Sequence, residues 1–367
     1  MARTLRSDKI LFWSALALVC TSVVMVFSAS VLNKTAGSPL RQLGWAVAGI
    51  VALLVMMRID YHYLRRPAVI WTLVSFTAAG LIAVFFFDER NGASRWIEIG
   101  HLTWQPSEFA KVVAIVFAAA VLERRMHRIN DVSYSLVPIG IVTGALAFLI
   151  VMEPDLGTAT VLILVVLAMV FAAGLSWRYL AGVFLLMLPV VTYFIVAYPW
   201  RVARILSFMD PSRDPLGDRY QLGQSEIALG SGGTFGLGLG NGLQKVFFLP
   251  EAHNDFIFAV VGEELGLIGT TAILVCFAVI AWRGLRAALL APDRFGALMG
   301  IGIALMVGLQ AFINMSVVTG LAPTKGIPLP LVSAGGSSLV MNLLAMGILL
   351  NISQQASSTA AATVDAR

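Results

Sequence analysis

Residues 157–175 read GTATVLILVVLAMVFAAGL, a run of 19 residues without a charged side chain. A helix of about 20 such residues has the length that crosses the hydrocarbon core of a bilayer. Further apolar runs of similar length recur along the chain. The ten predicted spans are residues 10–32, 40–57, 67–87, 106–122, 134–152, 157–175, 178–198, 255–282, 296–320 and 336–352. The sequence therefore predicts an all-α polytopic membrane protein with about ten transmembrane helices.

The composition excludes several classes of protein. Of the 367 residues, 59% are hydrophobic and only 12% are charged, about half of the roughly 25% that is usual in a soluble domain. A soluble fold of this size could not remove so much apolar surface from water. Disordered proteins, nucleic-acid-binding domains and ordinary cytosolic enzymes are therefore excluded.

Basic residues predict the orientation, because cytoplasmic loops of membrane proteins are enriched in Lys and Arg. With the N-terminus inside, 14 of the 25 Lys and Arg fall in cytoplasmic segments. They are Arg3, Arg6, Lys9, Arg58, Arg65, Arg66, Arg124, Arg125, Arg128, Arg178, Arg283, Arg286, Arg294 and Arg367. Both termini are therefore expected in the cytoplasm.

The domain organisation follows from these spans. Residues 1–353 are predicted to form a single integral-membrane domain, and the Ser/Ala/Thr-rich residues 354–367 a flexible cytoplasmic tail. Residues 198–254 form a large extracytoplasmic loop between spans seven and eight, too long for a plain connector. Its glycine tract, residues 230–242, contains neither GxGxxG nor GxxxxGK. A flexible loop that passes close to other backbone is therefore favoured over a phosphate-binding loop.

Acidic residues are concentrated near the outer ends of the spans. Asp255 directly precedes span eight, where a carboxylate can be a helix N-cap or a general base. Its position alone slightly favours the cap. Glu108 and Lys111 lie three residues apart in span four, so they can pair on one helix face. Glu263 and Glu264 are adjacent in span eight and should point into different environments. For these intramembrane charges, structural pairing and catalysis are equally compatible with the sequence.

Five separated motifs resemble those of the SEDS family, named for shape, elongation, division and sporulation. They are residues 91–97 (NGASRWI), 105–111 (QPSEFAK), 153–157 (EPDLG), 249–256 (LPEAHNDF), and 323–326 (PTKG) with 335–338 (GGSS). The resemblance covers nearly the whole chain. It implies a ten-helix fold and a peptidoglycan glycosyltransferase that polymerises lipid II, a disaccharide peptide on undecaprenyl pyrophosphate. The expected location is the outer face of the bacterial inner membrane.

The resemblance also implies roles for individual residues. Asp255 matches the family's essential acid, which reverses the preference for a cap and makes it the expected catalytic base. The expected substrate-binding residues are Glu108, Lys111, Arg95, Trp96, Asp155, Arg204, Lys325 and Ser337. A leaving pyrophosphate needs cations, and Lys111 is the first candidate because it lies in a span beside an acid. No cofactor is required with certainty, and a divalent cation, Mg²⁺ or Mn²⁺, is an alternative source of positive charge.

Two stretches, residues 324–326 and 250–252, look closer to FtsW, the division branch of the family, than to RodA, the elongation branch. Asn254 stands where the family usually has Thr or Ser, and Ala334 where it usually has Tyr. A RodA-like elongation polymerase and a lipid II flippase are the alternatives. An acid on a loop at one face favours the enzyme, because a transporter needs polar groups through the full depth of the membrane.

The expected protein partners follow from a missing motif. None of the lysines has a serine three residues before it, so the chain lacks the SxxK motif of peptide cross-linking enzymes. The resemblance implies an FtsI-like class B penicillin-binding protein on spans eight and nine, with other divisome membrane proteins and no nucleic acid. The small residues Gly296, Gly300, Ala304 and Gly308 permit close helix approach there. Packing of this stripe against the chain's own helices is the alternative.

Overall fold

The structure is a computed structural model that describes residues 7–30, 39–87, 95–100, 102–210, 217 and 219–365. Part of the 91–97 motif and the basic residues Arg3, Arg6 and Arg367 lie outside the described residues. So do residues 211–216 and 218 of the long loop between spans seven and eight.

Ten helices correspond in sequence to the ten predicted spans. They are α1 (Lys9–Ser30), α2 (Pro39–Arg58), α3 (Pro67–Ala83), α4 (Pro106–Arg125), α5 (Val137–Met152), α6 (Leu156–Ala172), α7 (Trp177–Val196), α11 (Ile257–Leu289), α12 (Arg294–Val318) and α13 (Gly336–Asp365). The other elements are α8 (Pro199–Met209), α9 (Tyr220–Gly232), α10 (Gln244–Phe247), β1 (Ile97–Ile99), β2 (Leu102–Trp104), and short helical turns at Tyr61–Arg65, Val84–Phe86, Met126–Arg128 and Val132–Leu136.

The predicted fold class is confirmed. In the described part of the chain, eight helices are long and apolar enough to cross a membrane. The remaining two predicted spans are α6, which is apolar but shorter, and α4, which carries buried charges. The protein is therefore a multi-pass helical membrane protein. The last helix, α13, continues to Asp365, so residues 354–365 are helical where the sequence predicted a flexible tail.

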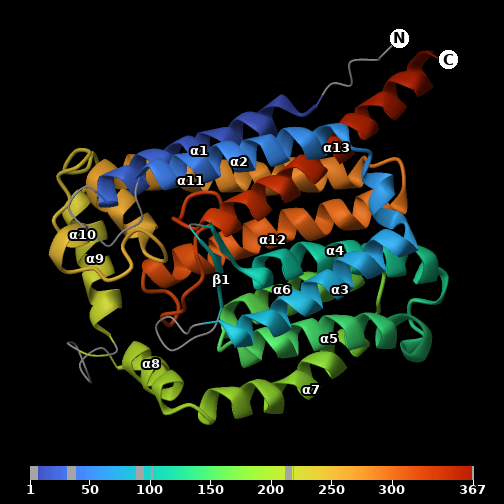
Figure 1. Ribbon diagram of the computed structural model, residues 1–367, viewed down its shortest axis with the longest axis horizontal. Helices are drawn as coiled ribbons and strands as arrows, with labels where there is room; N and C mark the ends of the chain where they lie inside the picture. The colour runs from blue at the N-terminus through green and yellow to red at the C-terminus, as the bar shows by residue number, and fades with distance from the viewer. Residues whose placement is uncertain are drawn as a thin grey trace.

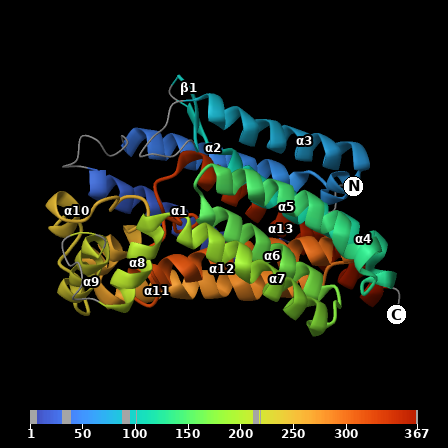
Figure 2. The same ribbon diagram turned by 90° about the horizontal axis from the view of Figure 1, so that it is seen from below.

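The helices form one bundle with α4 and α12 in its interior (Figure 1). Fifteen of the 20 residues of α4 are buried, whereas α7 has no buried residue among those described. In Figures 1 and 2, α8, α9 and α10 lie together at one end of the bundle. Helix α1 begins and α13 ends at the opposite end. The long connection thus contains three helices at one end of the bundle, of which α9 is the longest.

A short hairpin was not predicted. Strands β1 and β2 pair antiparallel between α3 and α4, with Ile97 opposite Trp104. The hairpin packs against the bundle through Trp104, whose ring lies next to Phe76 of α3. It places the residues just before β1 at the same end of the bundle as the start of α4.

The glycine tract passes close to a break in α11, as predicted. Gly266 interrupts the helix with a φ of 65°, and the amides of Leu237 and Leu267 bond to carbonyls across the contact. A Cβ on Gly236 would lie 2.1 Å from the Glu264 carbonyl oxygen, and one on Gly232 would lie 1.8 Å from that of Gly262. Only glycine allows backbone to approach backbone this closely.

Glu263 and Glu264 have different hydrogen-bond partners, but both bind residues 240–245, so their surroundings are not separate, contrary to what the sequence predicted. The Glu263 carboxylate accepts hydrogen bonds from the amides of Leu243 (2.7 Å) and Gln244 (3.1 Å). Glu264 pairs with Lys245 and accepts a hydrogen bond from Ser28 of α1. Both acids therefore hold the long connection against α11.

The small-residue stripe of α12 packs inside the protein, so the prediction of a partner-facing stripe is wrong. A Cβ on Gly300 would lie 2.8 Å from Ala288 Cβ of α11, and one on Gly296 would lie 2.8 Å from the Tyr61 hydroxyl. Ala304 is 1% exposed, and a Cβ on Gly284 of α11 would lie 2.9 Å from its Cβ. The stripe permits close packing of α12 on α11, which a small-residue pattern alone could not distinguish from a partner surface.

We predict that Gly236→Ala destabilises the protein by at least about 2 kcal/mol, since it combines a positive φ of 79° with a backbone clash. Thermal unfolding in detergent measures the effect. Gly230→Ala is the matched control, because Gly230 has no neighbour within 4 Å and lies in α9. Equal melting temperatures for the two variants would contradict the close contact.

Candidate active site

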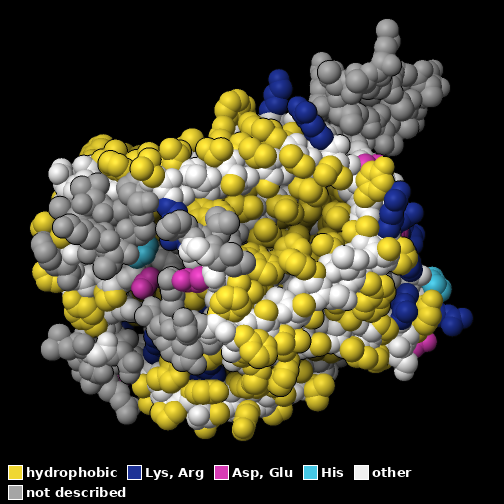
Figure 3. Space-filling model, in the orientation of Figure 1, with side chains coloured by type: hydrophobic (Ala, Val, Ile, Leu, Met, Phe, Trp, Pro, Cys, Tyr) yellow, Lys and Arg dark blue, Asp and Glu magenta, His cyan; other side chains and the backbone are white. Residues whose placement is uncertain are grey.

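A polar cavity of about 980 Å³ opens at the end of the bundle that carries α8 and α9. In Figure 3, acidic side chains and a few Lys and Arg side chains show at this end of the largely apolar face, whereas more Lys and Arg side chains gather at the other end. Seven of the nine predicted site residues line the cavity. They are Asp255, Arg95, Trp96, Asp155, Arg204, Lys325 and Ser337.

The turn that carries Asp255 is held by hydrogen bonds that other segments donate to its backbone carbonyls. The Asn314 side chain of α12 donates to the Asp255 carbonyl (2.8 Å), and the Ser333 hydroxyl donates to the Asn254 carbonyl (2.7 Å). The Ala334 amide donates to the His253 carbonyl (3.0 Å). Asn254 and Ala334, which depart from the family pattern, make these contacts with backbone atoms, so neither departure removes them.

The interpretation of Asp255 as a helix cap is wrong. The N-cap of α11 is Phe256, and no side chain caps this helix. Within the described residues, no group donates a hydrogen bond to the Asp255 carboxylate. Its side chain faces the cavity, where a Cβ on Gly326 would lie only 2.9 Å from Oδ2. The carboxylate is therefore free to accept a proton from a bound molecule.

The surroundings of Asp255 raise the pKa of its carboxyl to about 7. Desolvation by burial is the largest cause, and the negative charge of Glu251 adds to it. Arg95 opposes this increase. A carboxylate with a pKa near neutrality is well matched to general base catalysis.

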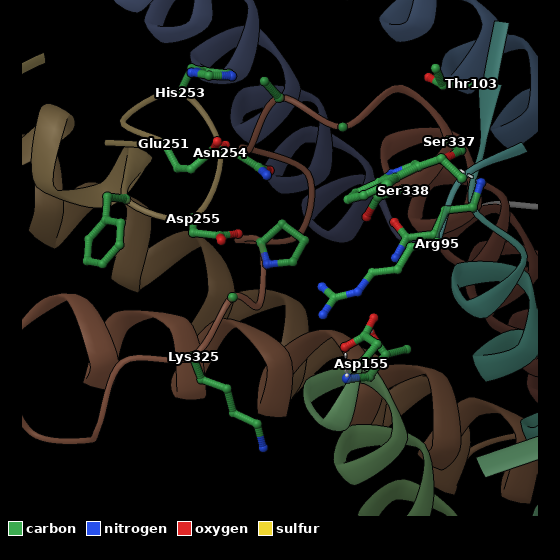
Figure 4. A pocket seen from close by; sticks show the side chains of 18 of the residues that line it. Arg95, Thr103, Asp155, Glu251, His253, Asn254, Asp255, Lys325, Ser337 and Ser338 are labelled. Carbon is green, nitrogen blue, oxygen red and sulfur yellow. Dashed lines mark hydrogen bonds between the residues drawn. The ribbon is translucent and has the colours of Figure 1, made fainter. Parts of the chain in front are cut away.

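Among the described residues, four Lys and Arg side chains line the cavity: Arg41 and the three predicted site residues Arg95, Lys325 and Arg204, which come from different segments. Figure 4 shows the Arg95 side chain pointing into the cavity, with Asp155 and Asp255 on either side. Its guanidinium donates to the carbonyls of Glu153 (3.2 Å) and Pro154 (2.6 Å). Lys325 Nζ lies 3.3 Å from the Thr160 hydroxyl, and burial lowers its pKa. The third cation, Arg204 of α8, lies over the ring of Trp200.

Asp155 and Ser337 make local structural bonds as well as lining the cavity. Asp155 caps α6, because its carboxylate accepts from the Thr158 amide (3.1 Å) and hydroxyl (2.8 Å). The Ser337 hydroxyl accepts a hydrogen bond from the Gln105 amide (3.2 Å) and so connects the start of α13 to the start of α4.

Glu108 and Lys111 form a buried pair behind the cavity wall. Their side chains are 2.9 Å apart and only 2–3% exposed, and neither residue lines the cavity. Lys111 Nζ also donates to Gln310 Oε1 (2.7 Å), and Ser338 Oγ, on the cavity wall, donates to Glu108 Oε2 (2.9 Å). The predicted pairing is present, and both charged groups already have partners.

Several residues near the site were not predicted. Gln310 and Asn314 are buried amides in the apolar run of α12, and their polarity within a span was the available signal. Glu153 is fully buried, both of its carboxylate oxygens lack hydrogen-bond partners among the described residues, and its pKa is raised to about 9 by desolvation. Among the described residues, no group of three or more His, Cys, Asp or Glu could hold a metal ion.

The site can accept a proton from a hydroxyl and bind an anion in the same cavity. The chain is similar to known proteins along nearly its whole length. A family model described as "Cell cycle protein", for FtsW, RodA and SpoVE, matches residues 8–358.

Two relatives are similar to this chain over nearly their whole length. A probable peptidoglycan glycosyltransferase FtsW of Geobacter sp. (strain M18) is 41% identical, covering 96% of this chain and 98% of the relative. The stage V sporulation protein E of Bacillus subtilis is 40% identical, covering 95% and 97%.

Two solved structures have the same fold. One is a chain from a study of polymerization and crosslinking by a peptidoglycan synthase complex, with a TM-score of 0.80, 31% identity and coverage of 96% of this chain and 99% of that chain. The other is the rod shape determining protein RodA of Thermus thermophilus, with a TM-score of 0.70, 28% identity and coverage of 95% and 97%. The chain therefore belongs to the SEDS family of FtsW, RodA and SpoVE proteins.

Proposed function

We propose that this protein is an FtsW-like peptidoglycan glycosyltransferase that polymerises lipid II into glycan strands during cell division. The observation that carries the proposal is the Asp255 carboxylate, which has a raised pKa and faces a cavity lined by Arg95, Arg204 and Lys325. The names of the relatives support the same activity.

The reaction needs one base and a place for an anion. Asp255 accepts the proton of the acceptor sugar's 4-hydroxyl while that oxygen attacks the anomeric carbon of the donor. The bond from this carbon to the lipid pyrophosphate breaks, and the pyrophosphate leaves as an anion. A single inverting displacement of this kind needs no second carboxylate as nucleophile, and pyrophosphate needs no general acid.

The cations that face the cavity are better placed than Lys111 to stabilise the leaving pyrophosphate. Lys111 is 3% exposed and already bonded to Glu108 and Gln310. Arg95 and Lys325 line the cavity, and Lys325 Nζ lies 3.3 Å from the Thr160 hydroxyl, with the Asp155 carboxylate close enough to affect its pKa. An anion held by charged groups in such a poorly solvated site is stabilised more strongly than in water.

The location and partners follow from this activity. We place the cavity on the outer face of the bacterial inner membrane, at the division septum, and both termini in the cytoplasm. Figure 1 supports the shared side of the termini, since α1 begins and α13 ends at the end opposite the cavity. A class B penicillin-binding protein is the proposed cross-linking partner, as supported by the synthase complex whose chain resembles this one.

Purified protein in liposomes with lipid II tests the proposal. Glycan strands are expected. Lipid II translocation without polymer would favour the flippase alternative, and neither product would indicate a scaffold for other division proteins.

We predict that Asp255→Asn lowers the rate of glycan polymerisation by about 10²–10⁴-fold, because an amide cannot accept the proton. Gel analysis of glycan strands measures the rate, and the melting temperature serves as the folding control. Since Asp255 does not cap α11, the substitution should not lower stability. A folded Asp255→Asn protein with near-normal activity would refute the assignment of the base.

The pH profile should follow the same carboxylate. Burial raises the pKa of Asp255 to about 7, so its proton-accepting form is lost as the pH falls below that value. We expect kcat/KM to fall about tenfold per pH unit below about 7 and to level off above it. A profile that is flat from about pH 5.5 to 8 would argue against Asp255 as the base.

Gly326→Ala should also lower kcat, because its Cβ would lie 2.9 Å from Asp255 Oδ2 and displace the carboxylate. A displacement of about 1 Å at a reacting group can lower the rate about 100-fold. Gly308→Ala is the control, since its Cβ would make an ordinary contact of 3.7 Å with Ala281. Equal rates for both variants would mean that the carboxylate can move without loss of activity.

A further inference from the structure

Two amide side chains lie one turn apart on the same face of α12, deep in the bundle. Gln310 is 0% exposed and Asn314 is 1% exposed. A spacing of four residues places both on one side of the helix. Buried amides are retained only where they find partners, so their contacts indicate what they do.

Asn314 joins the turn that carries Asp255 to the segment that follows α12. Its Nδ2 donates to the Asp255 carbonyl (2.8 Å) and to the Ile327 carbonyl (2.7 Å). Both hydrogen atoms of the amide are therefore used. Its Oδ1 has no partner among the described residues, so the orientation of the amide is set by the two carbonyls it binds.

Gln310 makes the equivalent connection one turn earlier. Its Nε2 donates to the Pro328 carbonyl (3.0 Å), while its Oε1 accepts from Lys111 Nζ (2.7 Å). Lys111 is paired with Glu108, which accepts from Ser338. Hydrogen bonds thus run from the buried ion pair of α4 to the cavity wall.

We propose that Asn314 and Gln310 are positioning residues for Asp255, and that Lys111 acts on the reaction through Gln310 instead of by touching the substrate. The proposal rests on the proposed function, in which Asp255 is the base. Asn314 fixes the peptide of Asp255 directly, and Gln310 fixes the neighbouring backbone of residues 327–328.

Space around the carboxylate explains why this matters. Gly326 approaches Asp255 so closely that a Cβ would lie 2.9 Å from Oδ2, and Gly326 is next to the Ile327 carbonyl that Asn314 holds. Without the Asn314 amide, neither the Asp255 carbonyl nor the Ile327 carbonyl is held. Both sides of the narrow gap between Asp255 and Gly326 can then move. The carboxylate then loses its fixed position relative to the acceptor hydroxyl, whereas Arg95 and Arg204 belong to segments that Asn314 does not hold.

The experiment compares variants of the full-length protein in liposomes with lipid II. Asn314→Asp keeps the size of the side chain but removes its N–H donors, and Asn314→Leu removes the polar group. For both we expect kcat to fall about 10–100-fold with KM for lipid II nearly unchanged, and the acidic limb of the pH profile to move. Gln310→Met should lower kcat in the same way by a smaller factor.

Asn351→Asp is the matched control. Asn351 is 4% exposed and holds a backbone carbonyl of another element, that of Met57 at 2.8 Å, but it lies in α13 near the turn at Tyr61, and it does not line the cavity. It should lose stability as Asn314→Asp does, yet keep kcat and the pH profile. This comparison separates positioning from a general loss of stability.

Unchanged kcat and an unmoved pH profile in folded Asn314→Asp would overturn the proposal while leaving Asp255 as the base. An active Asp255→Asn would instead refute the proposed function itself. If Asn314→Asp and Asn314→Leu fail to fold, Asn314→Ser, which keeps one donor, and Gln310→Met decide. A kcat equal to that of the unsubstituted protein in both would overturn the proposal.

Discussion

The connection between α12 and α13 returns into the bundle without forming a helix, so its backbone groups must find partners within the protein. Gln310 and Asn314 bind two of its carbonyls, and the Ser333 hydroxyl accepts from the Leu329 amide. Ser333 also donates to the turn before α11. The irregular backbone and the turn that carries Asp255 are therefore fixed by one set of hydrogen bonds, and both segments line the cavity.

The charged side chains near these hydrogen bonds form two groups, a buried ion pair and the cations that face the cavity. The side chains of Glu108 and Lys111 are only 2–3% exposed, and each has a second polar partner, which offsets the free energy of burying it. Arg95, Lys325 and Arg204 belong to three segments that meet at the end of the bundle. Positive charge is thus available to a ligand only where side chains reach the cavity.

The membrane spans could be predicted because each is an apolar run whose length is set by the bilayer. Six of the seven predicted residues that line the cavity could be named because they belong to recognisable motifs; the exception is Arg204, which lies in the long loop. A sequence pattern does not show which other element a residue packs against. A stripe such as Gly296 and Gly300 indicates close approach but not which helix approaches, and here it is α11.

Three other features were not settled by the sequence patterns. Asp255 was compatible with a helix cap until the position of the α11 N-terminus was known. The sequence left open whether Lys111 faces the cavity. In the structure its ammonium is already bonded to Gln310, which is 199 residues away in the sequence. The hairpin at residues 97–104 has too few residues for a periodic signal. Of these features, only the contact of Lys111 depends on a residue distant in sequence; the helix start and the hairpin are local but too short to give a periodic pattern.

The break at Gly266 divides α11 into two parts with different surroundings. Before it, residues 257–264 are buried in protein, whereas Leu267 and Ile268 directly after it are 62% and 55% exposed. The part from Leu267 to Leu289, about 23 residues, is roughly 34 Å long and matches the hydrocarbon thickness. The part before it raises Asp255 roughly 14 Å above the level of the break. The buried part thus acts as a spacer between Asp255 and the part of α11 that is long enough to cross a bilayer.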